Sequence, residues 1–441
     1  MFRRRWSGLP ADPIYPSDLT ELGFVRHHTY HSARANQKSH RYFVNEQDEI
    51  RLIDDPDYYF KYFITKNERW NERQRFAFNS ACRDLILARL QSLGLQQILL
   101  PLGTPSPSHP HVPILASTNL LNRPDHNPSQ DEPTSRRRPS RVVVIFPEGT
   151  SELGVITHRV VSNAGGVTKG SMIGLVQALQ QQPSSPSDPT PPGVIIANPG
   201  ELWWWPEGQR GLTPFGRHGV PMASAVHYGR FHDKDKNEIP GNEGVPEHVR
   251  YVLSEAVPEL LLLRKDDEKD GDKVRTKIDV IAVGMTADCV EKYLGSDEGW
   301  EKLGGRLNSL AVVGGFQDVD ELKCEGFKRF LEERARAYIL HHAPLDTPVA
   351  GPKGNPKLFT FTSFGCPVFS AGDALVTEMA LVEAQPAILK WIQQVALEGD
   401  AYKNPDVVVV EDDEEEEEVE DVDGASVNVH PELSEQQSAS S

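Results

Sequence analysis

The sequence predicts an α/β protein whose mostly parallel sheet is covered by helices on both faces, with disordered tails. Three segments, 142–146, 194–197 and 278–283, are apolar apart from Asp279, and segments of helical period separate them. Strands buried on both faces have this composition, and they occur in parallel sheets with crossover helices. Only 38% of the 441 residues are hydrophobic, which is below the globular average and indicates that part of the chain is unfolded.

Before that pattern begins, the chain contains one long helix and two short strands. Residues 1–50 mix Pro, His and Arg without periodicity, so we expect an irregular arm. A helix is predicted over 71–93, because apolar residues recur on one face and Gly94 follows as a stop signal. The segments "QQILLP" and "HVPILA" are predicted to be short strands. Residues 103–140 and 181–192 are rich in Pro and Ser, which predicts flexible inserts.

The rest of the chain alternates strands and helices as far as about residue 400. The strands are "RVVVIF", "GVIIA", "KIDVIAV" and "SLAVVGGF". The helices are "KGSMIGLVQALQQQ", "PEHVRYVLSEAV", "CEGFKRFLEERARAYIL" and "PAILKWIQQVAL", and the last three carry an apolar stripe of the kind that covers a sheet. We therefore place one folded domain at 51–400. Residues 401–441 are acidic and then Ser/Gln-rich, which is typical of a disordered tail.

The charge balance argues against a nucleic-acid-binding surface. The formal net charge is −18, and ten of the eleven residues 411–421 are acidic, which leaves −8 (−18 + 10) for the remainder. Nucleic-acid-binding proteins usually carry a basic surface, so we expect no direct contact with nucleic acid. The basic cluster Arg136, Arg137, Arg138 and Arg141 fits an import signal, an RNA contact or a solvated loop.

Cysteine and histidine spacing predicts neither disulfides nor a metal site. Four cysteines are far apart and form no CxxC pair, namely Cys82, Cys289, Cys324 and Cys366. The group His27, His28 and His31 has no adjacent Cys or carboxylate cluster to complete a metal site. We expect no metal and no cofactor. No signal peptide and no run of about 18 apolar residues is present, which predicts a soluble intracellular protein without a membrane contact.

The segment 278–294 has the outline of a nucleophile elbow but lacks the nucleophile. An α/β-hydrolase holds its catalytic serine at a sharp strand-to-helix turn, in the pattern small-x-Ser-x-small. Here the turn reads Val283-Gly284-Met285-Thr286-Ala287, which places Met285 at the nucleophile position. Met285 has no ionisable proton, and the β-branched Thr286 is poorly suited to a turn with positive φ.

The histidine base is missing independently of the nucleophile. In an α/β-hydrolase it follows the acid, near the end of the domain, but residues 343–428 contain no histidine. His341 and His342 end a predicted helix, where their charge suits the helix dipole. A hydrolase with a non-standard active site would therefore need Cys289 or Ser171 as nucleophile, with His227 or His248 as base. Cys289 fits the core better, and Ser171 and His248 fit helix starts.

The motif "FPEGTS" at 146–151 offers a different interpretation. It resembles the phosphate-contacting motif of glycerolipid acyltransferases, which also need an upstream His-x4-Asp. His126 and Asp131 have that spacing, but they lie only about 20 residues upstream, within a Pro/Ser-rich segment. The alternative is that "PEG" forms the loop that helps build the oxyanion hole of a hydrolase.

Seven motifs follow one another along the chain, namely "ITKNERWNERQRFAF", "RVVVIFPEG", "VIIANPGE", "IPGNEGVPEHVRYV", "IDVIAVG", "APLDTPVAG" and "CPVFSAGD". Together they resemble the argonaute-binding "Arb-two" domain family, which also includes the C-terminal domains of some fungal class II histone deacetylases. Their order and spacing match from about residue 60 to 397. The resemblance implies an α/β-hydrolase-like fold.

The resemblance also implies that catalysis has been lost. Hydrolase-like members carry a His-Ser-x-Gly-Gly elbow, which here falls on Gly284, Met285, Thr286, Ala287 and Asp288. The acid expected after the next strand falls near Gly314, with Asp318 just beyond, and the late histidine falls near Val376. The oxyanion-loop His-Gly corresponds to Pro147-Glu148. We therefore expect a fold that keeps a vestigial elbow and is not an enzyme.

The partners that the resemblance implies are an argonaute protein and an associated complex subunit, in RNA-interference-linked heterochromatin silencing. A histone-deacetylase-associated chromatin adaptor, which holds histones through the acidic tail, is the alternative. Either role favours the nucleus, with the cytoplasm as a second location. Trp203, Trp204 and Trp205 follow a strand among Gly and Pro, which suggests either an exposed partner-binding loop, a lid or internal packing. The loop 230–243 is a second candidate surface.

Overall fold

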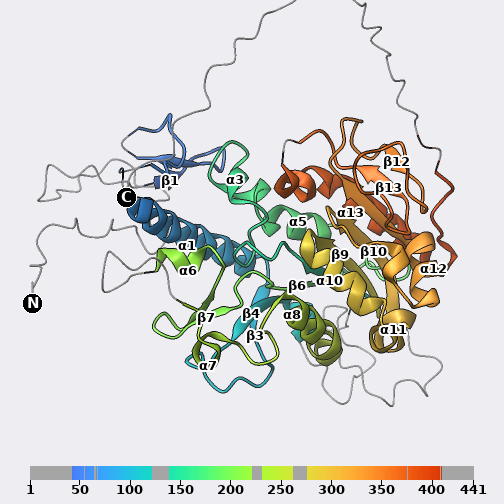
Figure 1. Cartoon of the computed structure of the whole chain (residues 1–441), viewed down its shortest axis with the longest axis horizontal. Coiled ribbons are helices and arrows are strands. Elements are labelled where there is room, and N and C mark those ends of the chain that lie inside the picture. The colour runs from blue at the N-terminus through green and yellow to red at the C-terminus, as the bar shows by residue number, and fades with distance from the viewer. Residues whose placement is uncertain are drawn as a thin grey trace, which may run out of the picture. The chain divides into compact units, whose positions relative to one another are not determined.

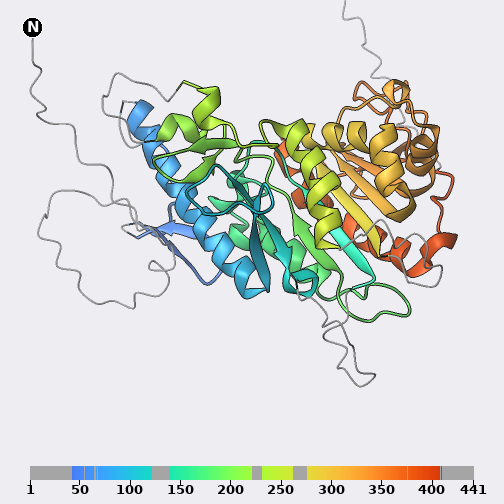
Figure 2. The same cartoon turned by 90° about the horizontal axis from the view of Figure 1, so that it is seen from below.

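A nine-stranded sheet lies at the centre of the computed structural model, with helices on both faces (Figures 1 and 2). The structure describes residues 42–121, 139–220, 231–261, 276–407 and 409, except 54, 64, 65, 67 and 375. The strand order is β12-β13-β11-β10-β9-β5-β6-β4-β3. Among the described residues, no helix is long and apolar enough to cross a membrane.

The strand directions confirm the predicted fold class. The six consecutive strands β13, β11, β10, β9, β5 and β6 are parallel to one another. The strands at the two edges are antiparallel, because β12 pairs antiparallel with β13, and β4 pairs antiparallel with both β6 and β3. The sheet is therefore mostly parallel and α/β-hydrolase-like. The bounds of its strands are β3 (Leu95–Leu100), β4 (Val112–Ser117), β5 (Arg141–Phe146), β6 (Gly193–Ile196), β9 (Lys277–Val283), β10 (Leu307–Val313), β11 (Ala335–Ile339), β12 (Pro348–Ala350) and β13 (Val368–Ser370).

Alternate residues of each strand point to two separate hydrophobic cores. In β5, Val143 and Ile145 join one core, and Val142, Val144 and Phe146 join the other. The first core is completed by α1 (Glu68–Ser92), α3 (His158–Val161), α4 (Gly166–Lys169), α5 (Met172–Leu179) and α13 (Ala380–Glu398). The second is completed by α2 (Thr118–Leu121), α8 (Val245–Tyr251), α9 (Val257–Leu260), α10 (Met285–Leu294), α11 (Asp297–Leu303) and α12 (Glu325–Arg334).

Both ends of the folded domain extend beyond the predicted limits of 51 and 400. A hairpin of β1 (Tyr42–Val44) and β2 (Ile50–Leu52) begins within the predicted irregular arm of 1–50, and its Tyr42 and Ile50 are buried in the first core. At the other end, Tyr402 is buried and its hydroxyl accepts a hydrogen bond of 2.7 Å from the Trp391 indole. Of the two predicted tails, residues 1–41, 408 and 410–441 fall outside the described residues.

The predicted inserts are partly structured. Strand β4 lies inside 103–140 and forms part of the sheet, as "HVPILA" predicts, while residues 122–138 are outside the described part. Residues 181–192 form a turn held by backbone bonds between Ser184 and Thr190 and between Ser185 and Asp188. The predicted helix "CEGFKRFLEERARAYIL" is wrong in its last third. Helix α12 ends at Arg334 and the chain continues directly as β11, because the following residues pair with β10 and β13.

A second hairpin lies outside the main sheet. It consists of β7 (Trp203–Trp205) and β8 (Arg210–Leu212), which pair antiparallel. The short helices α6 (Gly216–Gly219) and α7 (Lys234–Asn237) follow it. The hairpin places the three tryptophans on a paired strand rather than on a loop.

Candidate functional site

A cavity of about 590 Å³ opens at the carboxyl ends of β5, β9 and β10. This edge of an open α/β sheet is where ligands usually bind. Its floor comes from the β5–α3 loop, the turn between β9 and α10, and the residues after β10, while α1 and residues 377–378 form its sides. Side chains of opposite character line it. Carboxylates are contributed by Glu72, Glu148, Glu152 and Glu378, and apolar groups by Phe60, Phe76, Phe215, Met285 and Phe316.

The strained residue of the elbow is Gly284, one position before the predicted Met285. Gly284 has φ 58° and ψ −141° and caps helix α10, in a backbone region that residues with a Cβ rarely adopt. Met285 is the first helical residue, and 65% of its surface is exposed beside the cavity. Thr286 and Ala287 are buried. The turn is therefore built as predicted, but its apex needs a glycine.

The carboxylate of Glu148 occupies the space above that apex. A Cβ placed on Gly284 would lie 1.5 Å from Glu148 Oε2, so the side chain of a nucleophile and this carboxylate exclude each other. Among the described residues, the hydrogen-bond donor to Glu148 is the N–H of Gly149, which contacts Oε1 at 3.2 Å. Burial raises the pKa of Glu148, the Gly149 N–H lowers it in part, and the nearby Asp288 and Glu378 raise it further.

In the described part of the chain, no histidine lies after β13, where the late catalytic histidine of a hydrolase is expected. The chain after β13 brings Thr377 and Glu378 to the cavity, and Glu378 accepts a hydrogen bond of 3.2 Å from the Thr157 hydroxyl. His341 and His342 stack on each other after β11, not at a helix end as predicted. Asp318, the acid just beyond the expected position at Gly314, caps the short helix Val319–Glu321 by accepting from the Asp320 N–H at 3.0 Å.

The alternative catalytic residues have structural partners. Ser171 is buried and caps α5, where its hydroxyl accepts from the Ile173 N–H at 3.4 Å. His248 is also buried, and both ring nitrogens are bonded, Nε2 to the Asn198 N–H at 3.0 Å and Nδ1 to Asn242 Oδ1 at 2.7 Å. Burial lowers the pKa of His248 to about 3, which keeps the ring neutral. Burial also raises the pKa of Cys289, which opposes formation of a thiolate.

One carboxylate–histidine pair lines the cavity and was missed by the sequence reasoning. His158 Nε2 lies 2.5 Å from Glu152 Oε2. Burial raises the pKa of Glu152, but the adjacent His158 outweighs this effect and brings the pKa to about 2. No hydroxyl is recorded as a hydrogen-bond partner of the His158 ring among the described residues, and its Nδ1 is buried without a partner. Among the described residues, the pair therefore has no hydroxyl hydrogen-bonded to its ring that it could activate as a nucleophile.

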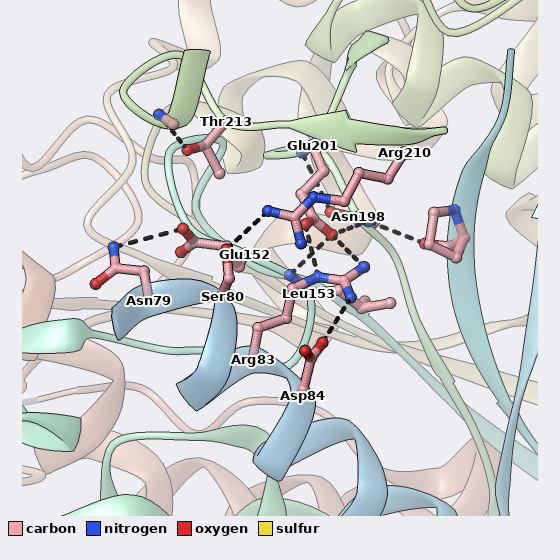
Figure 3. Close-up of polar contacts among 12 residues, drawn as sticks. Asn79, Ser80, Arg83, Asp84, Glu152, Leu153, Asn198, Glu201, Arg210 and Thr213 are labelled. Carbon is pink, nitrogen blue, oxygen red and sulfur yellow. Dashed lines mark hydrogen bonds and ion pairs between the residues drawn. The ribbon is translucent and has the colours of Figure 1, made fainter. Parts of the chain in front are cut away.

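A buried ion pair joins α1 to the start of the tryptophan hairpin (Figure 3). Arg83 donates two hydrogen bonds to Glu201, from Nε to Oε1 at 2.7 Å and from Nη2 to Oε2 at 3.0 Å. Glu201 also accepts from the Leu153 N–H at 3.3 Å and from the Asn198 amide at 2.9 Å. The network fixes the loops after β5 and β6 to α1, beside the cavity. Residues 83 and 201 are 118 positions apart, so their contact has no sequence signal.

The expectation that the tryptophans lie on an exposed loop is wrong. Trp203 and Trp204 are 7% and 2% exposed, and Trp205 is half-buried. Trp204 packs into the second core and lies 4.9 Å from the His111 ring. These side chains are buried because β7 pairs with β8 and the hairpin packs on the domain, with Trp204 in the second core. Of the loop 230–243, residues 231–243 are described, and Phe231 is almost fully exposed.

Several predicted candidates fall outside the described residues, namely His27, His28, His31, His126, Asp131, Arg136, Arg137, Arg138 and His227. Arg141 does not belong to a solvated basic cluster. It is 1% exposed at the start of β5 and forms a buried ion pair with Asp279. In the described part of the chain, no group of three His, Cys, Asp or Glu side chains is placed to bind a metal ion.

Comparison with known proteins gives one family. The Arb2 domain matches residues 36–127 and 134–345. No curated protein matches the chain. A solved structure described as "Crystal Structure of DphMB1" is 12% identical, and the alignment covers 68% of this chain and 85% of that chain with a TM-score of 0.28. A similarity at this level carries no inference about fold or function.

Proposed function

Because the chain belongs to the Arb2 domain family, we propose that it is a non-catalytic scaffold that binds an argonaute-containing small-RNA assembly. The family resemblance implies this partner and a role in heterochromatin silencing, which would place the protein in the nucleus. A binding role requires a folded surface and no reactive group.

The geometry of the elbow is the observation that supports this proposal. A hydrolase needs a side-chain nucleophile at the strained turn, with a base beside it. Here glycine holds the turn, and the Glu148 carboxylate lies where the Cβ of a nucleophile would be. A negative charge at this place would also repel the oxyanion that forms in acyl transfer.

The mouth of the cavity favours binding instead. Phe215, Met285 and Phe316 line the cavity, and each is about 60% exposed. Exposed apolar side chains gathered at one hollow are typical of interaction sites. This rim replaces the buried tryptophans as the proposed contact surface.

Two experiments test the proposal. Purified protein should hydrolyse short-chain p-nitrophenyl esters only at background rate, and clear turnover that is lost in Ser171→Ala or Cys289→Ala would refute a non-catalytic role. Tagged full-length protein should co-purify argonaute from its native cells. The double variant Met285→Ser/Phe316→Ser should reduce that recovery, whereas Phe359→Ser, at a fully exposed residue outside the cavity lining, should not.

The acidic run at 411–421 favours a second candidate, a chromatin adaptor that holds histones. A dense negative segment attracts basic proteins by long-range electrostatics. Deletion of 411–441 should abolish histone binding under this alternative, and should leave argonaute recovery unchanged under the main proposal.

A further inference from the structure

We infer that the cavity at the elbow accepts a lysine side chain presented by a partner protein. This inference rests on the proposed binding function and specifies the chemistry of the group that is bound. It follows from the charge, the shape of the available acceptor and the apolar rim.

The first observation is a half-buried carboxylate without a cation. Among the described residues, no Lys, Arg or His forms an ion pair with Glu148. The other carboxylates of the lining have partners. Glu72 pairs with Arg75 at 2.5 Å, Glu152 pairs with His158, and Glu378 lies 3.9 Å from Arg159. Glu148 is therefore the carboxylate to which an incoming cation would add a charge-assisted bond.

The second observation decides between the two common cationic side chains. Oε1 of Glu148 already accepts from Gly149, and Oε2 lies over the Cα of Gly284. A guanidinium binds best to both oxygens of a free carboxylate, whereas an ammonium needs one acceptor. Each oxygen can accept two hydrogen bonds, but the Gly149 bond competes with a bidentate approach to both oxygens, and this competition favours lysine over arginine.

The third observation concerns the stem of the side chain. Phe215, Met285 and Phe316 surround the approach to the cavity and leave more than half of their surface exposed. The four methylene groups of lysine would cover these apolar groups while the ammonium reaches the carboxylate. A free amine lacks the backbone on either side, so a lysine within a polypeptide gains contacts that an amine does not.

The test uses the full chain and a short peptide with one central lysine and blocked ends, titrated by isothermal calorimetry or NMR at physiological salt. Matched peptides carry acetyl-lysine, arginine or glutamine at the same position, and butylamine represents a free amine. The lysine peptide should bind most tightly. Acetylation should weaken binding about tenfold or more, because it removes the charge-assisted hydrogen bond.

Two variants assign the binding to this cavity. Glu148→Gln should weaken the lysine peptide about tenfold, while Glu325→Gln, which removes the same charge from an exposed surface site, should not. Phe316→Ser should weaken it severalfold relative to Phe359→Ser. These positions are exposed, so the comparison remains valid if Glu148→Gln fails to fold. The inference is overturned if the acetyl-lysine peptide, the arginine peptide or butylamine binds as tightly as the lysine peptide. It is also overturned if both cavity variants bind the lysine peptide as tightly as the wild type does.

Failure of this inference is distinguishable from failure of the proposed function. If argonaute co-purifies and the lysine peptide does not bind, the protein is a scaffold that uses another contact. If the peptide binds as expected and argonaute does not co-purify, the cavity has the inferred chemistry and serves a different partner.

Discussion

Replacing Glu291 by methionine should stabilise the folded protein at neutral pH. Glu291 lies in α10, the helix that begins at the elbow, and its side chain is fully buried. Neither carboxylate oxygen has a hydrogen-bond partner among the described residues. Burial raises the pKa of Glu291 well above its usual range, and the nearby Asp288 raises it further. The folded state therefore holds this carboxyl protonated at a pH where the unfolded chain releases the proton.

The sign of the pH dependence follows from proton linkage. The folded state binds the proton more tightly, so stability is greatest below the unfolded pKa of about 4.3 and falls as pH rises toward the folded pKa. Each pH unit in that window costs about 1.4 kcal/mol, which limits the cost at pH 7 to roughly 4 kcal/mol. Methionine has a similar length and no polar atom to desolvate. We expect Glu291→Met to raise the free energy of unfolding by about 2–4 kcal/mol at pH 7.

Urea denaturation followed by tryptophan fluorescence at pH 5 and pH 7.5 measures this effect. The advantage of Glu291→Met should grow by about 1–3 kcal/mol between the two pH values. Glu291→Gln is the matched control, because it removes the ionisable proton but leaves a polar group without a partner. The reasoning fails if the methionine variant is less stable than the wild type at pH 7.5, or if its advantage does not change with pH.

Other substitutions test the remaining buried features, each by thermal or urea denaturation. Glu201→Gln should lower the free energy of unfolding by about 3–5 kcal/mol, because it leaves Arg83 buried without its charge partner. The prediction is contradicted if Glu201→Gln lowers the stability by less than Asn79→Ala does. Acidification from pH 6.5 to pH 5 should remove up to about 2 kcal/mol through His248, whose pKa near 3 lies below its unfolded value; a His248→Gln variant with the same slope would refute the assignment. Trp204→Ala should cost about 3–5 kcal/mol because Trp204 is buried. A loss near zero, as expected for an exposed interface residue, would contradict this.

The alternation of strands and helices was predictable because burial on both faces leaves uninterrupted apolar strands. Segments 142–146 and 278–283, of which the second is apolar except for Asp279, therefore appear as β5 and β9 with nearly the predicted bounds. Strand β11 was missed because it follows α12 without a turn residue, and a short apolar segment after a helix continues the helical pattern. The tryptophans were misplaced because Gly and Pro around them suggest a loop, whereas pairing with β8 depends on contacts across the hairpin.

The candidate site was predictable in outline and not in detail. A strand followed by small residues and a helix predicts the elbow, but the choice between Gly284 and Met285 depends on which residue takes positive φ. The position of the Glu148 carboxylate over the turn depends on the conformation of a loop 136 residues earlier in the chain. Contacts between distant segments, such as the Arg83–Glu201 pair, have no local pattern from which they could be deduced.

The overlap between Glu148 and a Cβ on Gly284 also constrains the evolutionary routes by which this domain could acquire a serine nucleophile at the turn. A serine introduced at position 284 would collide with the carboxylate and would add backbone strain. The loss of Glu148 therefore has to come before a serine at position 284. A hydrolase site of the usual kind would also need a histidine after β13, where Thr377 and Glu378 now line the cavity. Building such a site at this turn would therefore take at least three substitutions, and the change at position 148 has to precede the change at position 284.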